Sequence, residues 1–424
     1  MANVLSIEGL ALKFDTLDSI QPYIDQLHRV ETLHEVRFGG NTLGIQACAG
    51  VGEALSTKHH LKVADFSDIF TGRLITEIPQ SLRSLCTSLL YLPNLTSLDL
   101  SDNAFGGRSV EPMLEFLSSH PSLQVLKLNN NGMGPAGGTE IAGALLANAN
   151  KAKAEGRKPA LRTIICGRNR LENGSAQAFA DAFAALGSLV EVRMPQNGIR
   201  MEGIEAIVKG LRNNGDLEIL DLQDNTATER GSRAIAASLP SWPKLKTLNL
   251  SDCLLRPRGG VSVMQALSRG SNPLLTTLRL QSNELDSRAI GILATAISLH
   301  LGSLTSLELN GNYGESEDEC YVAVGKALAH WGHDDAMDEL DELEERESED
   351  EAEEDEEVED EDEEVENRQE ARLAVGEEES GGEDVRASEA DVVIKDKTAE
   401  LDEPKTNEPR EANELAALLD KIAL

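Results

Sequence analysis

The chain has 424 residues and a formal net charge of −35 at pH 7, with 74 acidic and 39 basic residues. The segment from Asp334 to Leu424 holds 40 of the acidic residues and only 9 of the basic ones. Such an acidic segment repels nucleic acid and anionic lipid, so we expect neither a nucleic-acid nor a membrane partner.

The start of the chain, "MANVLSIEGLALKFD", lacks a basic stretch followed by a long apolar core, so we expect no signal peptide. No apolar run approaches the roughly 18 residues that a membrane-spanning helix needs. The cysteines are few, scattered and without a CxxC pair: Cys48, Cys86, Cys166, Cys253 and Cys320. This usage favours a reducing compartment over a disulfide framework.

Over about its first 315 residues the chain repeats the pattern L-x-x-L-x-L-x-x-N-x-L. The regular matches begin at Leu33, Leu95, Leu123, Leu161, Leu189, Leu217, Leu245, Leu275 and Leu304. Most steps are close to 28 residues, whereas the step from Leu61 to Leu95 and the step from Leu123 to Leu161 are longer. A self-similarity of this kind predicts a leucine-rich repeat array.

Each repeat predicts a short strand, a turn and an amphipathic helix. Alternate leucines of the strand face the core, and the asparagine side chain can bond backbone groups that the turn leaves unpaired. These asparagines are Asn103, Asn131, Asn169, Asn197, Asn225, Asn283 and Asn312, with Cys253 in the same place in one repeat. The expected fold is an α/β solenoid of the ribonuclease-inhibitor type, a horseshoe with a concave parallel sheet and convex helices.

The stretch "DFSDIFTGRLITEIP", from Asp65 to Pro79, breaks this pattern. Here the asparagine is missing and the connection before the next helix is long. Arg73 follows Gly72 in this connection, and the residues alone predict an exposed arginine on a surface loop.

The charge distribution divides the chain into three parts. Residues 1–335 form the repeat domain with its terminal caps, and residues 336–388 form an acidic, low-complexity segment that we expect to be disordered. Residues 389–424 form a tail in which apolar spacing favours a short helix at 413–424.

Catalytic and metal-binding motifs are absent from the sequence. It contains no GxxxxGK[ST], HExxH or GxSxG, and its eight histidines form no ligand-like cluster. We therefore expect no active site, metal or cofactor of its own. The candidate binding surface is the polar concave face, where outward strand and turn positions are Asp99, Asp102, Lys127, Asn129, Asn130, Arg168, Arg193, Asp221, Asp224, Asn249, Asp252, Arg279 and Glu308.

The segments "DFSDIFTGRLITEIPQSL", "LNNNGMGPAGG", "CGRNRLENGS", "QNGIR" and "LDLQDNT" resemble the GTPase-activating proteins of the nuclear-transport GTPase Ran. The resemblance covers about residues 1–340, and the chain looks like the shorter, fungal type. It implies an activator of GTP hydrolysis, not an enzyme, in the cytoplasm or the perinuclear region. The implied partner is the GTP form of Ran, with a Ran-binding protein in a ternary complex. The implied activator is a monomer.

By the same resemblance, Arg73 is the family's essential arginine, an anchor or organiser at the interface that its loop projects from the rim. Asn130 is the asparagine that approaches the GTPase active site and supports the catalytic glutamine, and Asp224 contacts the GTPase. We assign Asp102, Asn129, Arg168 and Asp252 to the same contact. GTP and Mg²⁺ are held by the partner. The resemblance further implies that the activator positions the GTPase's own catalytic glutamine and inserts no arginine finger at the phosphate.

Two non-catalytic readings of the horseshoe compete with this one. The first is an inhibitor of the ribonuclease-inhibitor type, although such proteins are rich in cysteine. The second is an acidic histone chaperone, although its repeats would be shorter, near 22 to 24 residues. The length of the repeat and the "DIFTGR" loop favour the activator.

Overall fold

The computed structural model describes residues 3–345. Within this range the strands form one parallel sheet of eleven strands, in which each strand lies beside the strand of the next repeat. In order, the strands are β1 (Val4–Ser6), β3 (Glu35–Arg37), β5 (Val63–Asp65), β6 (Ser97–Asp99), β7 (Val125–Lys127), β8 (Thr163–Ile165), β9 (Glu191–Arg193), β10 (Ile219–Asp221), β11 (Thr247–Asn249), β12 (Thr277–Arg279) and β13 (Ser306–Glu308). A separate parallel pair joins β2 (Lys13–Phe14) to β4 (Thr42–Leu43).

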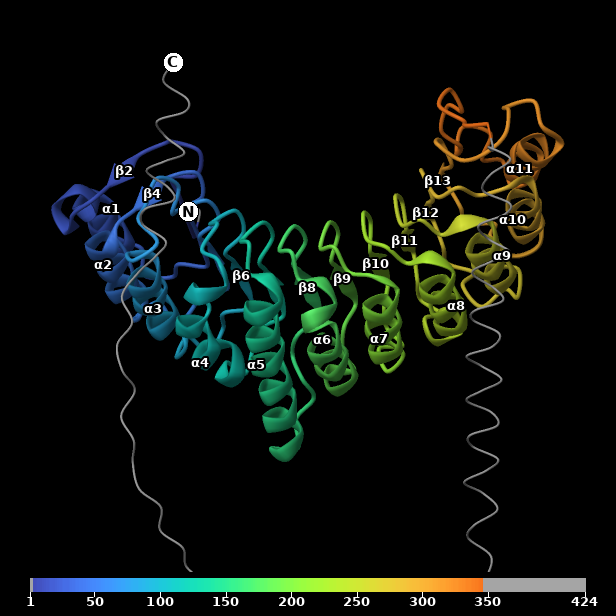
Figure 1. The fold of residues 1–424 in the computed structure, drawn as a ribbon. Coiled ribbons are helices and arrows are strands. Elements are labelled where there is room, and N and C mark those ends of the chain that lie inside the picture. Colours follow the sequence, from blue (N-terminus) through green and yellow to red (C-terminus); the bar gives the residue numbers. More distant parts are fainter. Residues whose placement is uncertain (1–2, 346–424) are drawn as a thin grey trace, which may run out of the picture. The chain divides into compact units, whose positions relative to one another are not determined.

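One helix follows most strands, and the helices cover the convex side of the sheet (Figure 1). They are α1 (Leu17–Arg29), α2 (Ile45–Leu55), α3 (Ile78–Leu89), α4 (Glu111–Ser119), α5 (Gly134–Ala154), α6 (Glu172–Leu186), α7 (Met201–Leu211), α8 (Thr228–Ser238), α9 (Arg256–Leu267), α10 (Ser287–His300) and α11 (Glu319–His330). Two short 3₁₀ helices, Gly107–Ser109 and Leu239–Ser241, precede α4 and follow α8. The predicted leucine-rich repeat solenoid is confirmed.

The core lies between the sheet and the helices. The middle residue of each strand is paired with its counterpart in the next repeat, as Leu98 is with Leu126 and Leu126 with Ile164. These side chains are buried, so the apolar stack continues from one repeat to the next. Because each repeat buries its apolar face only against its neighbours, the array depends on stacking for its stability.

The two long steps of the repeat have different structural causes. The step of 38 residues contains α5, which has 21 residues and extends beyond the neighbouring helices (Figure 1). The long step near Asp65 instead contains the extended connection between β5 and α3, in which Arg73 lies.

The last repeat is closed by residues that we expected to be disordered. Backbone bridges join Leu307 to Met337 and Tyr313 to Glu344, and Asp338 accepts from the N–H of Leu309 at 2.8 Å. The boundary at residue 335 is therefore too early, since residues 336–345 cover the free edge of β13. The remainder of the 336–388 segment and the 389–424 tail, with its expected helix at 413–424, lie outside the described residues.

Candidate functional site

The turns that follow the strands are tied together by the repeat asparagines. The amide nitrogen of Asn169 donates to the carbonyls of Leu128, Cys166 and Gly167 at 2.8, 3.0 and 3.0 Å. Its amide oxygen accepts from the N–H of Asn131 at 3.0 Å. Similar bonds to carbonyls of the preceding repeat are made by Asn41, Asn103, Asn131, Asn197, Asn225, Asn283 and Asn312. This asparagine ladder holds successive turns in register, because its buried amides bond on both sides.

The residue before the ladder position has a left-handed backbone in repeat after repeat. We call six of these residues the polar row: Asp102, Asn130, Arg168, Gln196, Asp224 and Asp252, with φ between 53° and 61°. Their N–H groups donate to the next turn, as Asn130 does to Gly167 at 2.9 Å. Side chains other than glycine are uncommon in this region of φ. The polar row contains five of the seven site residues predicted from the sequence.

A hollow of about 520 Å³ lies along this edge of the array. It is lined by Asn130, Arg168, Arg170, Gln196, Gly198, Asp224, Asn225, Thr226, Asp252 and Leu254. The lining brings two arginines together with two aspartates, so the hollow offers charges of both signs to a protein surface. Sequence reasoning missed Gln196 and Arg170. The signal that could have found them is their register, since Gln196 directly precedes a ladder asparagine and Arg170 directly follows one.

Asn130 is held in place by a neighbour of the polar row. Its amide nitrogen donates to a carboxylate oxygen of Asp102 at 3.0 Å, and both side chains are exposed. Asn129 has a different role, because its amide oxygen accepts from the N–H of Gly167 at 2.6 Å. Asp102 therefore orients the Asn130 amide, while Asn129 is engaged in holding two turns together.

Two polar residues expected on the open concave face are buried. Asp221 and Asn249 are only 7% and 2% exposed. The Asn249 amide donates to the Gln223 side chain at 3.1 Å, and the N–H of Gln223 donates to Asp221 at 3.2 Å. Burial raises the pKa of the Asp221 carboxyl above its ordinary value, although the hydrogen bond from the Gln223 N–H and the charge of the nearby Arg193 oppose the shift. These two residues end strands β10 and β11 and offer little surface to a partner.

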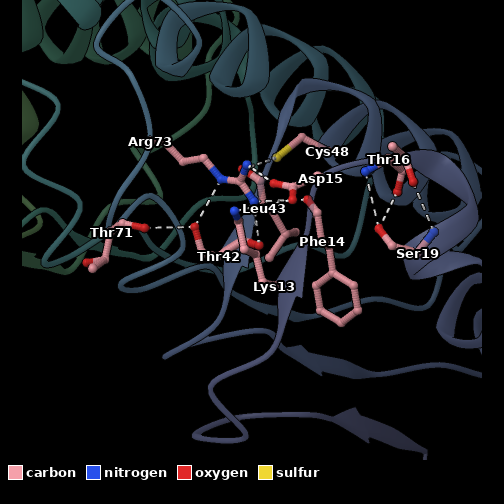
Figure 2. Close-up of polar contacts among 10 residues, drawn as sticks. All are labelled: Lys13, Phe14, Asp15, Thr16, Ser19, Thr42, Leu43, Cys48, Thr71 and Arg73. Atoms are coloured by element: carbon pink, nitrogen blue, oxygen red, sulfur yellow. Dashed lines mark hydrogen bonds and ion pairs between the residues drawn. The ribbon is translucent and has the colours of Figure 1, made fainter.

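Arg73 does not project from the rim, and this expectation was wrong. Its side chain is 8% exposed and points toward the first two repeats (Figure 2). The guanidinium forms an ion pair with Asp15 and donates to the carbonyls of Phe14 and Thr42 at 3.1 and 3.0 Å. Its Nε donates to the Thr42 hydroxyl at 3.0 Å. A guanidinium with these partners is a structural anchor in this conformation.

The anchor lies where the asparagine ladder is interrupted. Ile69 occupies the asparagine position of the third repeat, and it has no side-chain amide to donate to neighbouring carbonyls. Arg73 bonds instead to the ends of β2 and β4, the strand pair that exists only at this end of the described array. We call Asp15, Thr42 and Arg73 the arginine clamp.

The backbone beside Asp15 is fixed by the start of α1. Thr16 and Ser19 form a capping box, in which each side chain accepts from the other residue's backbone N–H (Figure 2). The hydrogen bond from Arg73 holds the pKa of the Asp15 carboxyl below its ordinary value. The carboxylate is therefore charged at neutral pH and available to the guanidinium.

Residues 70–77, which we call the Arg73 loop, are closely tied although they lack regular structure. The N–H of Arg73 donates to Phe70 and that of Glu77 donates to Leu74, both at 2.9 Å. The turn needs a left-handed residue at Gly72, where φ is 77°. Leu74 and Ile75 follow the clamped arginine and are 66% and 55% exposed.

No alternative chemical centre occurs among residues 3–345. They contain no group of three histidine, cysteine, aspartate or glutamate side chains that could hold a metal, and no helix long and apolar enough to cross a membrane. The five cysteines are buried and unpaired by disulfides. Burial raises the pKa of Cys48, Cys86, Cys166 and Cys253 to about 12, which leaves these thiols unreactive.

The fold and the edge described above define a leucine-rich repeat protein whose strand-end turns carry a continuous polar surface. The family described as "Leucine Rich repeat" matches residues 91–114 and 119–142. A solved structure of an internalin from Listeria monocytogenes is similar over 73% of this chain and 81% of its own, at 17% identity and a TM-score of 0.38. That likeness is too weak to bear on function.

Curated relatives are more specific. "Ran GTPase-activating protein 1" of Saccharomyces cerevisiae is 39% identical over 323 residues, which are 73% of this chain and 78% of the relative. The protein of the same name from Xenopus laevis is 46% identical over 46% of this chain and 34% of its own length. "Ran GTPase-activating protein" of Drosophila melanogaster is 39% identical over 51% of this chain, and the match spans 37% of that relative. The chain belongs to the Ran GTPase-activating protein family.

Proposed function

We propose that this chain activates GTP hydrolysis on Ran, the GTPase named in its relatives. The observation that carries the proposal is the match to the yeast relative across most of both chains. It is supported by the polar row, which lines up side chains of both charges along one edge for contact with a protein.

The proposed mechanism is positioning of a catalytic group that belongs to the GTPase. The Arg73 guanidinium has no free fork for a phosphoryl group in this conformation, because its donors are used within the chain. Activation of GTPases of this class can reach about 10⁵-fold, near 7 kcal/mol, with an arginine finger. Here a comparable share must come from ordering the GTPase's own glutamine and excluding water around it.

Asn130 is the proposed residue that supports this glutamine. It lies on the polar row, and its amide is oriented by Asp102 before any partner binds. A side chain already held in one orientation loses less conformational freedom on binding, which favours an effect on the transition state. Asp224, Arg168 and Asp252 line the same hollow and are the proposed binding contacts; Asn129 supports the turn beside them.

The proposal includes the finer properties of the partner and the chain. The partner is the GTP form of Ran, joined by a Ran-binding protein in a ternary complex, and the activator acts as a cytoplasmic or perinuclear monomer. GTP and Mg²⁺ are supplied by the GTPase. The activator contributes no active site of its own.

The test is single-turnover GTP hydrolysis on purified Ran with the full chain and two variants, Arg73→Ala and Asn130→Ala. We expect strong stimulation by the full chain, a much lower maximal rate with Asn130→Ala, and a loss with Arg73→Ala. Asp181→Ala, on the convex helix α6, is the control and should leave stimulation unchanged. If the full chain binds Ran without stimulating hydrolysis, the chain is a non-catalytic binding protein instead.

A further inference from the structure

We propose that the arginine clamp exists to present Leu74 and Ile75 as a preformed apolar contact for the GTPase. Asp15 and Thr42 are then positioning residues, which act on the partner through Arg73 and touch no reacting atom. This inference rests on the proposed function, and it assigns roles to four residues outside the polar row.

The first observation is the connectivity of the clamp. The guanidinium bonds to Asp15, Phe14 and Thr42 on one side. The Thr42 hydroxyl accepts from Arg73 and donates to the carbonyl of Thr71 at 2.8 Å. The clamp therefore holds the loop from two points, at Thr71 and at Arg73 (Figure 2). Leu74 follows directly after the clamped arginine in the sequence.

The second observation is how closely the chain packs around the clamp. A Cβ atom at Gly44 would lie 3.1 Å from the carbonyl oxygen of Asp15 and 3.2 Å from an Arg73 guanidinium nitrogen. Glycine at position 44 thus leaves room for the Arg73 guanidinium to lie against the backbone of the second repeat. Simple solvation of a loop arginine would need no such close approach.

The third observation is what the loop exposes. Leu74 and Ile75 leave more than half of their surfaces in water, although they are branched aliphatic residues in sequence next to an immobilised side chain. Apolar side chains stabilise a protein or a complex only when they are removed from water, so an exposed apolar pair contributes this free energy only once a partner covers it. A rigid presentation lowers the entropy lost when a partner covers the pair.

The fourth observation is position. Asp68, just before the Arg73 loop, has the left-handed backbone of the polar row and donates from its N–H to Ser101 at 2.9 Å. The next turn continues with Asp102, which donates to Asn129 at 2.8 Å. Asp68 therefore lies on the same edge as Asn130, two strand spacings or about 10 Å away at the sheet, and the Arg73 loop begins two residues after it. A GTPase seated against Asn130 is within reach of Leu74 and Ile75, and this continuity selects it as the occupant.

The experiment measures KM and kcat for Ran·GTP with the full chain, the double variant Leu74→Ser/Ile75→Ser, and Asp15→Ala. We expect the loop variant to raise KM at least about tenfold, with kcat within about twofold. Asp15→Ala should raise KM by a similar factor. Combined in one chain, the three substitutions should raise KM no further than the loop variant alone, because both changes remove the same contact.

Two control variants separate the inference from general effects of substitution. Leu299→Ser removes an aliphatic side chain that is 62% exposed and lies on α10. Glu111→Ala removes an ion pair of α4 with Arg83. Both should leave KM unchanged. Hydrogen exchange of residues 71–77 should be faster in Asp15→Ala than in the wild type, which reads the positioning directly.

The outcomes are distinguishable. If the wild-type chain stimulates hydrolysis and Leu74→Ser/Ile75→Ser keeps the wild-type KM, the apolar contact is wrong while the proposed function stands. If Asp15→Ala and the loop variant raise KM independently, so that their factors multiply, Asp15 has a separate role and the positioning claim fails. If the wild-type chain does not stimulate at all, the proposed function fails and the inference fails with it.

Discussion

The middle of the array and its amino-terminal end solve the same problem in different ways. In the middle, each turn leaves carbonyl groups that a buried asparagine satisfies, as Asn169 does for three of them. At the amino-terminal end the asparagine is replaced by Ile69, and Arg73 reaches back to carbonyls of the first two repeats.

The difference shows how a repeat protein can include a long, irregular connection and still keep its turns in one continuous row. The asparagine ladder uses a residue within the turn, so it fixes the turn's length and leaves the preceding residue to face outward. The arginine clamp uses a long side chain from a later position, so the connection can lengthen and still be held. The first device builds the polar row, and the second builds the Arg73 loop.

The largest effect should come from breaking the ladder. Asn169→Ala removes a fully buried amide, its hydrogen bonds to three carbonyls and the acceptor of the Asn131 N–H. Each carbonyl keeps one other donor, from Asn131, Asn197 or Asn130, so the Asn131 N–H is the group left unpaired. The unpaired N–H costs about 1–3 kcal/mol and each lost hydrogen bond about 0.5–1.5 kcal/mol, partly relieved by relaxation, so we expect a loss of about 3 kcal/mol in the free energy of unfolding. Urea unfolding measures it. Asn173→Ala, an exposed residue on α6, is the control, and an equal loss there would contradict the special weight of the ladder.

Breaking the clamp should cost less. Arg73→Ala removes the hydrogen bonds of the guanidinium to the carbonyls of Phe14 and Thr42. The Phe14 carbonyl still accepts from the N–H of Gly44 at 2.8 Å, and Asp15 is half exposed and can turn to water. We expect a loss of about 2 kcal/mol. Arg73→Lys should recover only part of it, since an ammonium group lacks the planar fork that meets three residues at once. Urea unfolding of both variants checks this, and full recovery by lysine would show that charge alone matters.

Most of the array could be predicted from the sequence because its information is periodic. The leucines and asparagines recur at nearly constant spacing, so the sheet, the ladder and the register of Asn130 and Asp224 follow from the pattern. The ladder position could equally have identified Gln196, since every residue of the polar row occupies the same place in its repeat.

The clamp could not be predicted in this way. Arg73 meets Asp15 across 58 positions and Thr42 across 31, and one of these partners lies in the irregular first repeat. Nothing periodic relates these positions, so only packing reveals them. The carboxy-terminal cap has the same cause: Asp338 and Met337 lie in a run that composition marks as disordered, yet they meet the unpaired edge of β13.

A smaller effect concerns a buried carboxyl in the middle of the array, Asp221, whose pKa shift is opposite in sign to that of Asp15 at the amino-terminal end. Asp221, at the end of β10, has a pKa raised by burial, so folding favours its protonated form. The charged carboxylate therefore lowers the free energy of unfolding. This loss develops as the pH rises from 3.8, the ordinary pKa of the carboxyl, through the raised pKa of the folded state. We expect Asp221→Asn to be more stable than wild type at pH 7 by up to about 1 kcal/mol. The advantage should vanish below pH 3.8, which urea unfolding at several pH values measures. A variant that is less stable at pH 7 would mean that the ion pair with Arg193 outweighs burial.

The smallest effect concerns Asp15, whose shift is opposite in sign. The hydrogen bond from Arg73 lowers its pKa below the ordinary value of 3.8, so the folded state favours the charged form. The resulting contribution to stability is complete above pH 3.8 and is lost as the pH falls through the lowered folded pKa. Water screens the half-exposed carboxylate, so the pH at which the carboxyl titrates is a sharper readout than stability. NMR titration of the Asp15 carboxyl should give a pKa below 3.8 in the wild type and one closer to 3.8 in Arg73→Ala.

Lys13 also pairs with Asp15, at 3.3 Å, and Lys13→Ala should move the pKa less because the arginine is the largest cause of the shift. If Lys13→Ala raises the Asp15 pKa more than Arg73→Ala does, then Lys13 is the main electrostatic partner of Asp15. The ion pair between Arg73 and Asp15 would then not distinguish the clamp from the ladder.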